Sequence, residues 1–337
     1  NRLNLIHISM FKKRIIYKII LLLILSFTSI IAIQNKSNIK KPIHYHHKKF
    51  KYQLFDQTSL KHVSHCQFIS CYIKNINNNN LFHSSSKNNH IIGSLIDNIH
   101  LSHKQLNNFT INQTEINKSS LKSMLIRESS FKLTSFKNSK ILNTVFQNTT
   151  FKRVSFPDTT LKQAIFLNCD IDTETEDILR KQDVILGFKE LEKKATKKSR
   201  LSHHPFFNIT FKKLNLNHIQ FNHTTFDFCN IDTVTLRNAA LKNNTLYKTN
   251  LSRIQGYQIH IANSTIKDST ITDSNIENAT LKNTTFINTT FNNINFDHSN
   301  WDTITLINSK FVDCSFENIT TNNIRLINSA TFAKKKK

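Results

Sequence analysis

The densest group of potential metal ligands in the sequence is three histidines within four positions, in the segment His44-Tyr45-His46-His47. Neutral imidazole nitrogens bind zinc and other transition metals, so such a group offers an ion several ligands at once. No carboxylate or cysteine lies nearby, and the neighbouring Lys48 and Lys49 are cationic. The composition therefore favours a solvated basic linker, with a metal site as the alternative interpretation.

The five cysteines form no Cys-X-X-Cys pair, and each stands two positions before a large apolar residue. They are Cys66, Cys71, Cys169, Cys229 and Cys314. Free cysteine behaves as a small hydrophobe in protein cores. We therefore interpret these residues as part of a core, with disulfides or metal binding as the alternatives.

Other chemistry has little support in the sequence. Three glycines are too few for a phosphate loop, a dinucleotide fingerprint or a nucleophile elbow, and none of these motifs occurs. Carboxylates such as Asp268 and Asp273, taken to lie on adjacent turns of a repeat, would suit calcium, but a turn preference explains the same spacing. We therefore predict no catalytic, cofactor-binding or metal-binding residue, and expect a protein that is not an enzyme.

Large apolar residues recur at every fifth position between Ala279 and Phe316. The series is Leu281, Phe286, Phe291, Phe296, Trp301, Leu306, Phe311 and Phe316. A small or β-branched residue stands two positions before each, and Asn or Asp is preferred two positions after. Neither the helical period of 3.6 nor the strand period of 2 produces this spacing. A fixed short period instead predicts a repeat architecture.

The same period covers two long stretches. From Ile91 to Ile171 all seventeen positions at five-residue steps are large and apolar. From Phe206 to Leu326 the same holds for twenty-three of twenty-five positions. The exceptions are Gly256 and Thr321, where we expect the coils to deform. Before position 91 the period is imperfect, and the polar tracts 77–80 and 84–86 are typical of loops.

These stretches resemble pentapeptide-repeat proteins, a bacterial family. Good copies of its pattern are Ala279-Thr280-Leu281-Lys282-Asn283 and Cys229-Asn230-Ile231-Asp232-Thr233. The chain departs from the family in using Thr often where Asp or Asn is usual, and Thr, Ser or Ile where Ala is usual. The resemblance implies a right-handed quadrilateral β-helix, in which four five-residue faces make a coil of about twenty residues. Central residues twenty apart, such as Phe291 and Phe311, should then stack at about 4.8 Å.

The expected fold is therefore an all-β solenoid in two blocks joined by an α-helical insert and preceded by an N-terminal hydrophobic helix. The insert begins with the capping pattern Thr173-Glu174-Thr175-Glu176 and continues with apolar residues at helical spacing to Ala195. We interpret it as a connector packed against a coil edge, and a partner-binding helix is the alternative. The predicted segments are an N-terminal segment 1–33, a basic linker 34–54, a first block 55–171, a helical connector 172–205, a second block 206–331 and a lysine tail 332–337.

The N-terminal segment has the layout of an export signal. A basic region at Lys12-Lys13-Arg14 leads into an apolar run from Ile19 to Ile33, and residues 1–9 precede Met10. We expect either a cleaved signal peptide or a retained membrane anchor. The linker would suit anionic lipid head groups if it stays beside a membrane.

The net charge of +24 is concentrated at the ends of the chain. Residues 1–53 carry +11 and the tail Lys334–Lys337 carries +4, whereas residues 206–331 carry only +1. This distribution disfavours nucleic acid as a partner. It also disfavours the DNA mimicry by which some pentapeptide-repeat proteins inhibit topoisomerase, because such mimicry needs an acidic rod.

The expected function is a non-enzymatic exported scaffold whose flat faces bind another protein in the cell envelope or on a host target. It would be periplasmic, extracellular or anchored in the cytoplasmic membrane. A secreted effector is a further alternative, although no remaining segment is long enough for an enzymatic domain. The sequence names no protein partner; homodimers through the β-helix ends are compatible with it, and no cofactor is expected.

Overall fold

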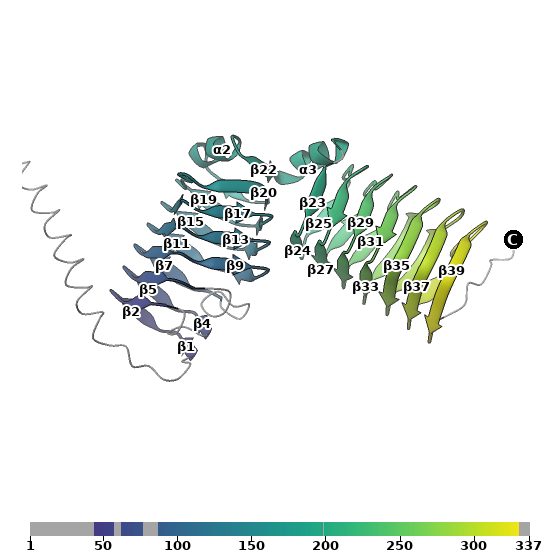
Figure 1. Cartoon of the computed structure of the whole chain (residues 1–337), viewed down its shortest axis with the longest axis horizontal. Helices are drawn as coiled ribbons and strands as arrows, with labels where there is room; N and C mark the ends of the chain where they lie inside the picture. The colour runs from purple at the N-terminus through teal and green to yellow at the C-terminus, as the bar shows by residue number, and fades with distance from the viewer. Residues whose placement is uncertain (1–43, 57–61, 77–86, 198, 330–337) are drawn as a thin grey trace, which may run out of the picture.

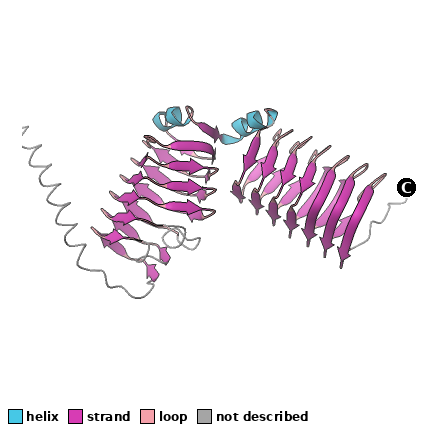
Figure 2. Ribbon diagram, viewed as in Figure 1, coloured by secondary structure: helices cyan, strands magenta, loops and turns pink. Residues whose placement is uncertain are grey.

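The computed structural model describes residues 44–56, 62–76, 87–197 and 199–329. These residues form an all-β solenoid with two short helices (Figures 1 and 2). The strands stack in parallel ladders, and the solenoid proceeds by adding one coil to the next. The expected β-solenoid is therefore confirmed.

The first run of coils precedes the helices, and its described residues form twenty-one strands. They are β1 (His44–His46), β2 (Lys49–Lys51), β3 (Leu54–Phe55), β4 (His62–Ser64), β5 (Gln67–Ile69), β6 (Tyr72–Lys74), β7 (His90–Ile92), β8 (Leu95–Asp97), β9 (His100–Ser102), β10 (Gln105–Asn107), β11 (Thr110–Asn112), β12 (Glu115–Asn117), β13 (Ser120–Lys122), β14 (Leu125–Arg127), β15 (Ser130–Lys132), β16 (Ser135–Lys137), β17 (Lys140–Leu142), β18 (Val145–Gln147), β19 (Thr150–Lys152), β20 (Thr160–Leu167) and β21 (Asp170–Ile171).

The connector contains α2 (Thr173–Leu179), β22 (Asp183–Leu186) and α3 (Gly187–Thr196). The second run follows it. Its strands are β23 (Arg200–Ser202), β24 (Pro205–Phe207), β25 (Thr210–Lys212), β26 (Gln220–Asn222), β27 (Thr225–Asp227), β28 (Asn230–Asp232), β29 (Ala240–Lys242), β30 (Thr245–Tyr247), β31 (Asn250–Ser252), β32 (His260–Ala262), β33 (Thr265–Lys267), β34 (Thr270–Asn275), β35 (Thr280–Ile287), β36 (Thr290–Asn295), β37 (Asn300–Ile307), β38 (Lys310–Val312) and β39 (Thr320–Ile327).

The sequence separation between paired residues of consecutive coils gives the number of residues in each coil. From β7 onward the paired residues lie twenty apart, as in β11 against β15 and β36 against β38. The first coil is shorter, because β2 pairs with β5 at a separation of eighteen, and the next is longer, because β5 pairs with β7 at a separation of twenty-three. These two unequal coils explain why the five-residue period is imperfect before Ile91. Strands β1 and β2 lie inside residues 34–54, the segment expected to be a linker, and β3 begins at its last residue.

The central apolar residue of each five-residue unit points inward and is buried almost everywhere along the solenoid. Residues in register stack on one another as expected. The rings of Phe291 and Phe311 lie 4.6 Å apart at 13°, and those of Phe296 and Phe316 lie 5.4 Å apart at 12°. Burying a side chain of this kind contributes about 1.5–3 kcal/mol, so the stacked core is a large source of stability for the fold.

The residue two positions after each central residue occupies a corner and has positive φ, between 47° and 65° at the non-glycine positions. Left-handed backbone is strained for most residues, but Asn and Asp tolerate it. This explains the Asn preference of the repeat. Corner side chains also form ladders from coil to coil: the amide of Asn308 donates to Asn288 at 3.2 Å, and that of Asn288 donates to Asp268 at 2.6 Å.

The small position of each unit is often Ser or Thr because its hydroxyl completes the backbone pairing inside the coil. Ser139 Oγ accepts from the main-chain N–H of Ser119 at 3.1 Å and donates to the main-chain oxygen of Lys137 at 2.7 Å. Ser119 Oγ accepts in turn from the N–H of Ile99 at 3.2 Å. The use of Ser and Thr in place of Ala therefore has a structural reason: their hydroxyls form a ladder along the solenoid and accept hydrogen bonds from buried main-chain N–H groups.

The connector differs from the single helix that was expected. Val184 and Ile185 lie in β22, which pairs with β20 at the same twenty-residue offset as an ordinary coil. These β-branched residues extend an existing ladder, and the gain from pairing outweighs the helical spacing of the apolar residues. The N-cap of α2 is Asp172, whose carboxylate accepts from the N–H of Thr175, so the expected cap at Thr173 is one residue too late.

Both helices cover parts of the solenoid. Thr175 and Leu179 of α2 are fully buried, and Thr175 Oγ1 accepts from the N–H of Val154 at 3.0 Å. Leu191 and Ala195 of α3 are also fully buried and share a hydrophobic cluster with β20, β22 and β24. Since the chain itself covers the apolar face of α3, the partner-binding alternative is not supported.

Gly256 does not deform its coil as expected. The flanking bridges Thr235 to Gln255 and Gln255 to Asn275 keep the twenty-residue register. Gly256 lines an apolar cavity of about 40 Å³, together with residues such as Leu246, Leu251 and Ile266.

The predicted N-terminal hydrophobic helix and lysine tail lie outside the described residues. Within the described ranges, no helix is long and apolar enough to cross a membrane.

Replacing Ser139 with Ala should destabilise the protein by about 1–3 kcal/mol, because the N–H of Ser119 then stays buried without its partner. Chemical denaturation of the variant measures the loss. The control is Ser135→Ala, which removes a hydroxyl from the outward side of β16 in the same coil. Equal losses for the two variants would contradict the role of the hydroxyl ladder.

Replacing Gly256 with Ala should stabilise the protein by about 0.4–1 kcal/mol, since the unfolded chain loses freedom and the new methyl enters the cavity. An added Cβ meets its nearest neighbours at 3.5 Å, which is ordinary contact. Gly93→Ala is the opposite control, because Gly93 has φ +56° and its substitution should destabilise. A destabilised Gly256→Ala protein would show that the cavity cannot take a methyl group.

Candidate functional site

One outer face of the first run is apolar. Leu125, Val145, Ile165 and Ile185 pair one above another across β14, β18, β20 and β22, in a position where most strands of the other faces carry polar residues. All four are buried and belong to one hydrophobic cluster with the second run. This face is therefore an internal contact and is not available to a partner.

Polar contacts surround this apolar contact. The Nε2 atom of His204 donates to the main-chain oxygen of Gln163 at 2.8 Å. The side-chain amide of Gln147 donates to the main-chain oxygen of Asn208 at 3.3 Å. The guanidinium of Arg127 lies 4.5 Å from the ring centre of Phe207. Segments far apart in sequence are thus joined by packing, hydrogen bonds and a cation–π contact.

Sequence reasoning missed this contact, although a signal was present. Outward-facing apolar residues spaced twenty apart in the sequence form a column of apolar side chains, and such a column is expected to be buried against another part of the protein. The signal becomes readable only once the coil length is known, because the same residues look scattered in a five-residue alignment.

A polar groove of about 490 Å³ lies on another face of the first run. Two columns in twenty-residue register form it, one of corner residues and one of strand residues. The lining residues are Asn88, Asn108, Glu128 and Asn148, with His90, Thr110, Ser130 and Thr150 and the adjoining Ser129. Ser130 Oγ is buried and has no hydrogen-bond partner among the described residues. The groove can therefore offer hydrogen bonds at intervals of one coil, about 4.8 Å.

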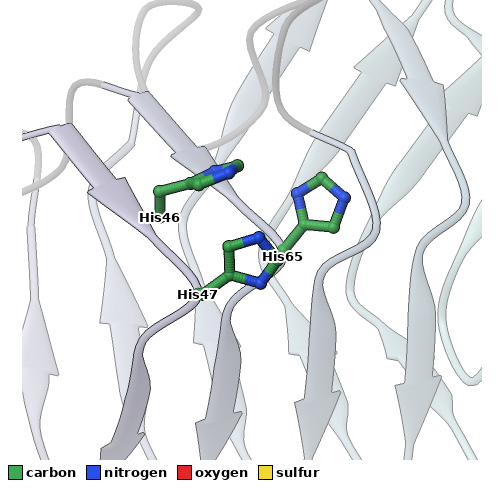
Figure 3. A group of neighbouring side chains, drawn as sticks. All are labelled: His46, His47 and His65. Carbon is green, nitrogen blue, oxygen red and sulfur yellow. The ribbon is translucent and has the colours of Figure 1, made fainter.

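The histidine cluster is joined by a residue that the sequence did not associate with it (Figure 3). His65 follows β4 and lies one coil above His47, which follows β1. The rings of His47 and His65 are stacked at 4.7 Å, and that of His46 lies 5.0 Å from His65. Within the described part of the chain, these three form the one group of three His, Cys, Asp or Glu residues able to share an ion.

The other candidate ligands take structural roles. Asp268 and Asp273 lie at neighbouring corners of one coil, so they are not on adjacent coils, and each accepts from an Asn of the next coil. The five cysteines are free thiols in the small position, as interpreted from the sequence. Burial raises the pKa of every one, to about 12 for Cys169 and Cys229, so none supplies a thiolate at neutral pH.

The chain matches no protein-family model and no curated protein. Among solved structures it is similar to HetL, a pentapeptide-repeat protein involved in heterocyst differentiation regulation from the cyanobacterium Nostoc sp. strain PCC 7120. The identity is 12% and the TM-score 0.23, over 71% of this chain and 89% of that chain. It is also similar to the pentapeptide-repeat protein Rfr23 from the cyanobacterium Cyanothece 51142, with 12% identity and a TM-score of 0.19 over 41% and 98% of the two chains. A PL6 alginate lyase, seen in complex with a trisaccharide, matches at 9% identity and a TM-score of 0.26 over 91% and 83%.

These values are too low for any inference about activity, substrate or partner. The five-residue repeat and the β-solenoid are themselves consistent with the pentapeptide-repeat family.

The contact between the first and second runs, here called the junction, should weaken in acid because of His204. Burial lowers the pKa of this imidazole from 6.5 to about 4. The unfolded chain therefore binds a proton that the folded chain excludes, and stability present above pH 6.5 is lost as the pH falls toward 4, by up to about 3 kcal/mol. Denaturation across this pH range, compared between the native chain and His204→Thr, measures the difference. Thr occupies the same position one coil later, at Thr224, and equal pH slopes for the two proteins would contradict this role.

Proposed function

We propose that this protein is a non-enzymatic, exported repeat scaffold that binds another protein in the cell envelope or on a host target. The observation that carries the proposal is the polar groove of the first run, with its two columns in twenty-residue register. A surface of this kind is wide and rigid, and it presents the same side-chain types at a fixed spacing, as repeat scaffolds do.

The internal contacts support a scaffold in two blocks. Strands β1 to β22 share their sheets among themselves, and strands β23 to β39 share theirs, within the described residues. The apolar column from Leu125 to Ile185 and the hydrogen bond from His204 hold the two runs together. In this proposal the junction fixes the orientation of the surface of the first run relative to that of the second. The helices α2 and α3 cover the junction.

Export is proposed from the sequence at the N-terminus. The basic residues Lys12, Lys13 and Arg14 and the apolar run from Ile19 to Ile33 would direct the chain to the membrane, where the segment is either cleaved or kept as an anchor. The basic charge of residues 34–53 would then lie beside anionic lipid.

The last coil is a candidate for self-association. In the described chain, β39 pairs only with β37, and Leu326 on it is 37% exposed. A free strand edge with apolar side chains favours pairing with another edge. A homodimer through these ends is therefore part of the proposal, whereas DNA mimicry is disfavoured by the net charge of +24.

Site-specific photo-crosslinking in native cells tests the proposed groove and its location together. A benzophenone amino acid at Thr110 should give a discrete protein adduct in the envelope or secreted fraction. The matched control is Thr270, the same residue at the same repeat position, on a face of the second run.

The adduct at Thr110 should disappear when Ser130 is replaced by Arg, which fills the groove. The proposal fails if both positions give the same adducts. It also fails if the protein and its adducts are confined to the cytosolic fraction.

A further inference from the structure

We propose that His46, His47 and His65 form a binding site for a late first-row divalent transition metal, of the class of Zn²⁺ and Cu²⁺, that fastens the first coil to the second. This site is independent of the proposed groove. The sequence favoured a solvated linker, because no carboxylate or cysteine lies near these histidines and their neighbours Lys48 and Lys49 are cationic.

Backbone pairing brings the ligands together. His47 and His65 occupy equivalent corners of consecutive coils, eighteen residues apart, with φ of 54° and 56°. The N–H of His47 donates to the main-chain oxygen of Ser64 at 3.2 Å. The two rings therefore face each other because of the fold, with His46 beside them, as Figure 3 shows.

The distances suit a small ion after modest side-chain movement. One ring nitrogen from each histidine lies within 4.8 Å of those from the other two. Metal–nitrogen bonds of about 2.0–2.1 Å in tetrahedral geometry place the nitrogens about 3.3 Å apart. His46 and His47 are exposed, so their rings can rotate to close the difference. Solvent would occupy the remaining coordination position.

His65 supplies the second, independent observation. Its Nδ1 atom is buried and has no hydrogen-bond partner among the described residues. Its Nε2 atom lies 2.7 Å from the side-chain amide nitrogen of Asn88. Metal-binding histidines characteristically present one nitrogen to the ion while a neighbour holds the other. In the structure the amide nitrogen of Asn88 faces Nε2, so binding of a metal at Nδ1 requires this amide to turn and present its oxygen, which leaves the proton on Nε2 and the lone pair on Nδ1.

The electrostatic surroundings select the class of metal. Desolvation, together with His47, His46 and Lys87, lowers the pKa of His65. Among the described residues no carboxylate belongs to this group, so Ca²⁺ and Mg²⁺, which prefer oxygen ligands, would bind to it poorly. Neutral imidazoles bind Cu²⁺ and Zn²⁺ well, and the order of affinity places Cu²⁺ first.

The position of the site suggests what the metal does. Among the described residues, strand β1 pairs with β4 alone. His46 ends β1, His47 follows it, and His65 follows β4. A bound ion would therefore link the two strands directly and hold the first described coil to the next.

The test is a titration of the full-length chain, prepared without a histidine tag, with Zn²⁺ alone, followed by calorimetry and by hydrogen exchange. We expect one equivalent to bind and the amides of β1 and β4 to become slower to exchange. His65→Asn should weaken binding by about 100-fold or more and abolish the added protection, because a ligand is lost. Asn is chosen because it tolerates the left-handed corner.

The matched control is His298→Asn, which makes the same change at a corner of the second run with φ 58°. It should leave the affinity and the protection unchanged. Hydrogen exchange without metal shows whether the first coil of His65→Asn is folded, and His46→Gln, at an exposed position, repeats the test if it is not. The proposal is overturned if the native chain binds no Zn²⁺, or if the His65 and His46 variants bind it as tightly as the native chain.

Discussion

The structure depends on one constraint, which is that every coil must present its main-chain N–H and C=O groups in register with those of the next coil. Parallel strands satisfy this on the faces, and left-handed residues allow the chain to turn at the corners without losing the ladder. At the small positions, where the chain turns inward, hydroxyls such as that of Ser139 take over the pairing. The apolar interior stabilises the fold, but backbone pairing determines its shape.

The same constraint explains how binding surfaces arise. Side chains twenty apart stand directly above one another, so a single preference repeated along the sequence becomes a continuous column. An apolar column from Leu125 to Ile185 makes the junction, and a polar pair of columns makes the groove. Three histidines from two coils of unequal length make the proposed metal site. In each case the chemistry comes from alignment across coils and not from a local motif.

The core was predictable from sequence because its period is short and nearly free of exceptions. The stacking of Phe291 on Phe311 followed from that period and a twenty-residue coil, and the Asn corners were visible as a preference. The proximity of His65 to His47 was not predictable, because it needs the eighteen-residue length of the first coil, which no local pattern encodes. Strand β22 was also missed, since Val184 fits a helical spacing when read alone and a ladder when β20 is beside it.

The unequal first coils carry a further consequence. Coils of eighteen, twenty and twenty-three residues all keep their strands paired, so the ladder tolerates changes in the number of residues between consecutive strands. Insertions and deletions between strands therefore alter which side chains meet across coils while leaving the architecture intact. A solenoid of this kind can acquire a new local site by a change of two or three residues in one turn, without any substitution among the residues that form the site.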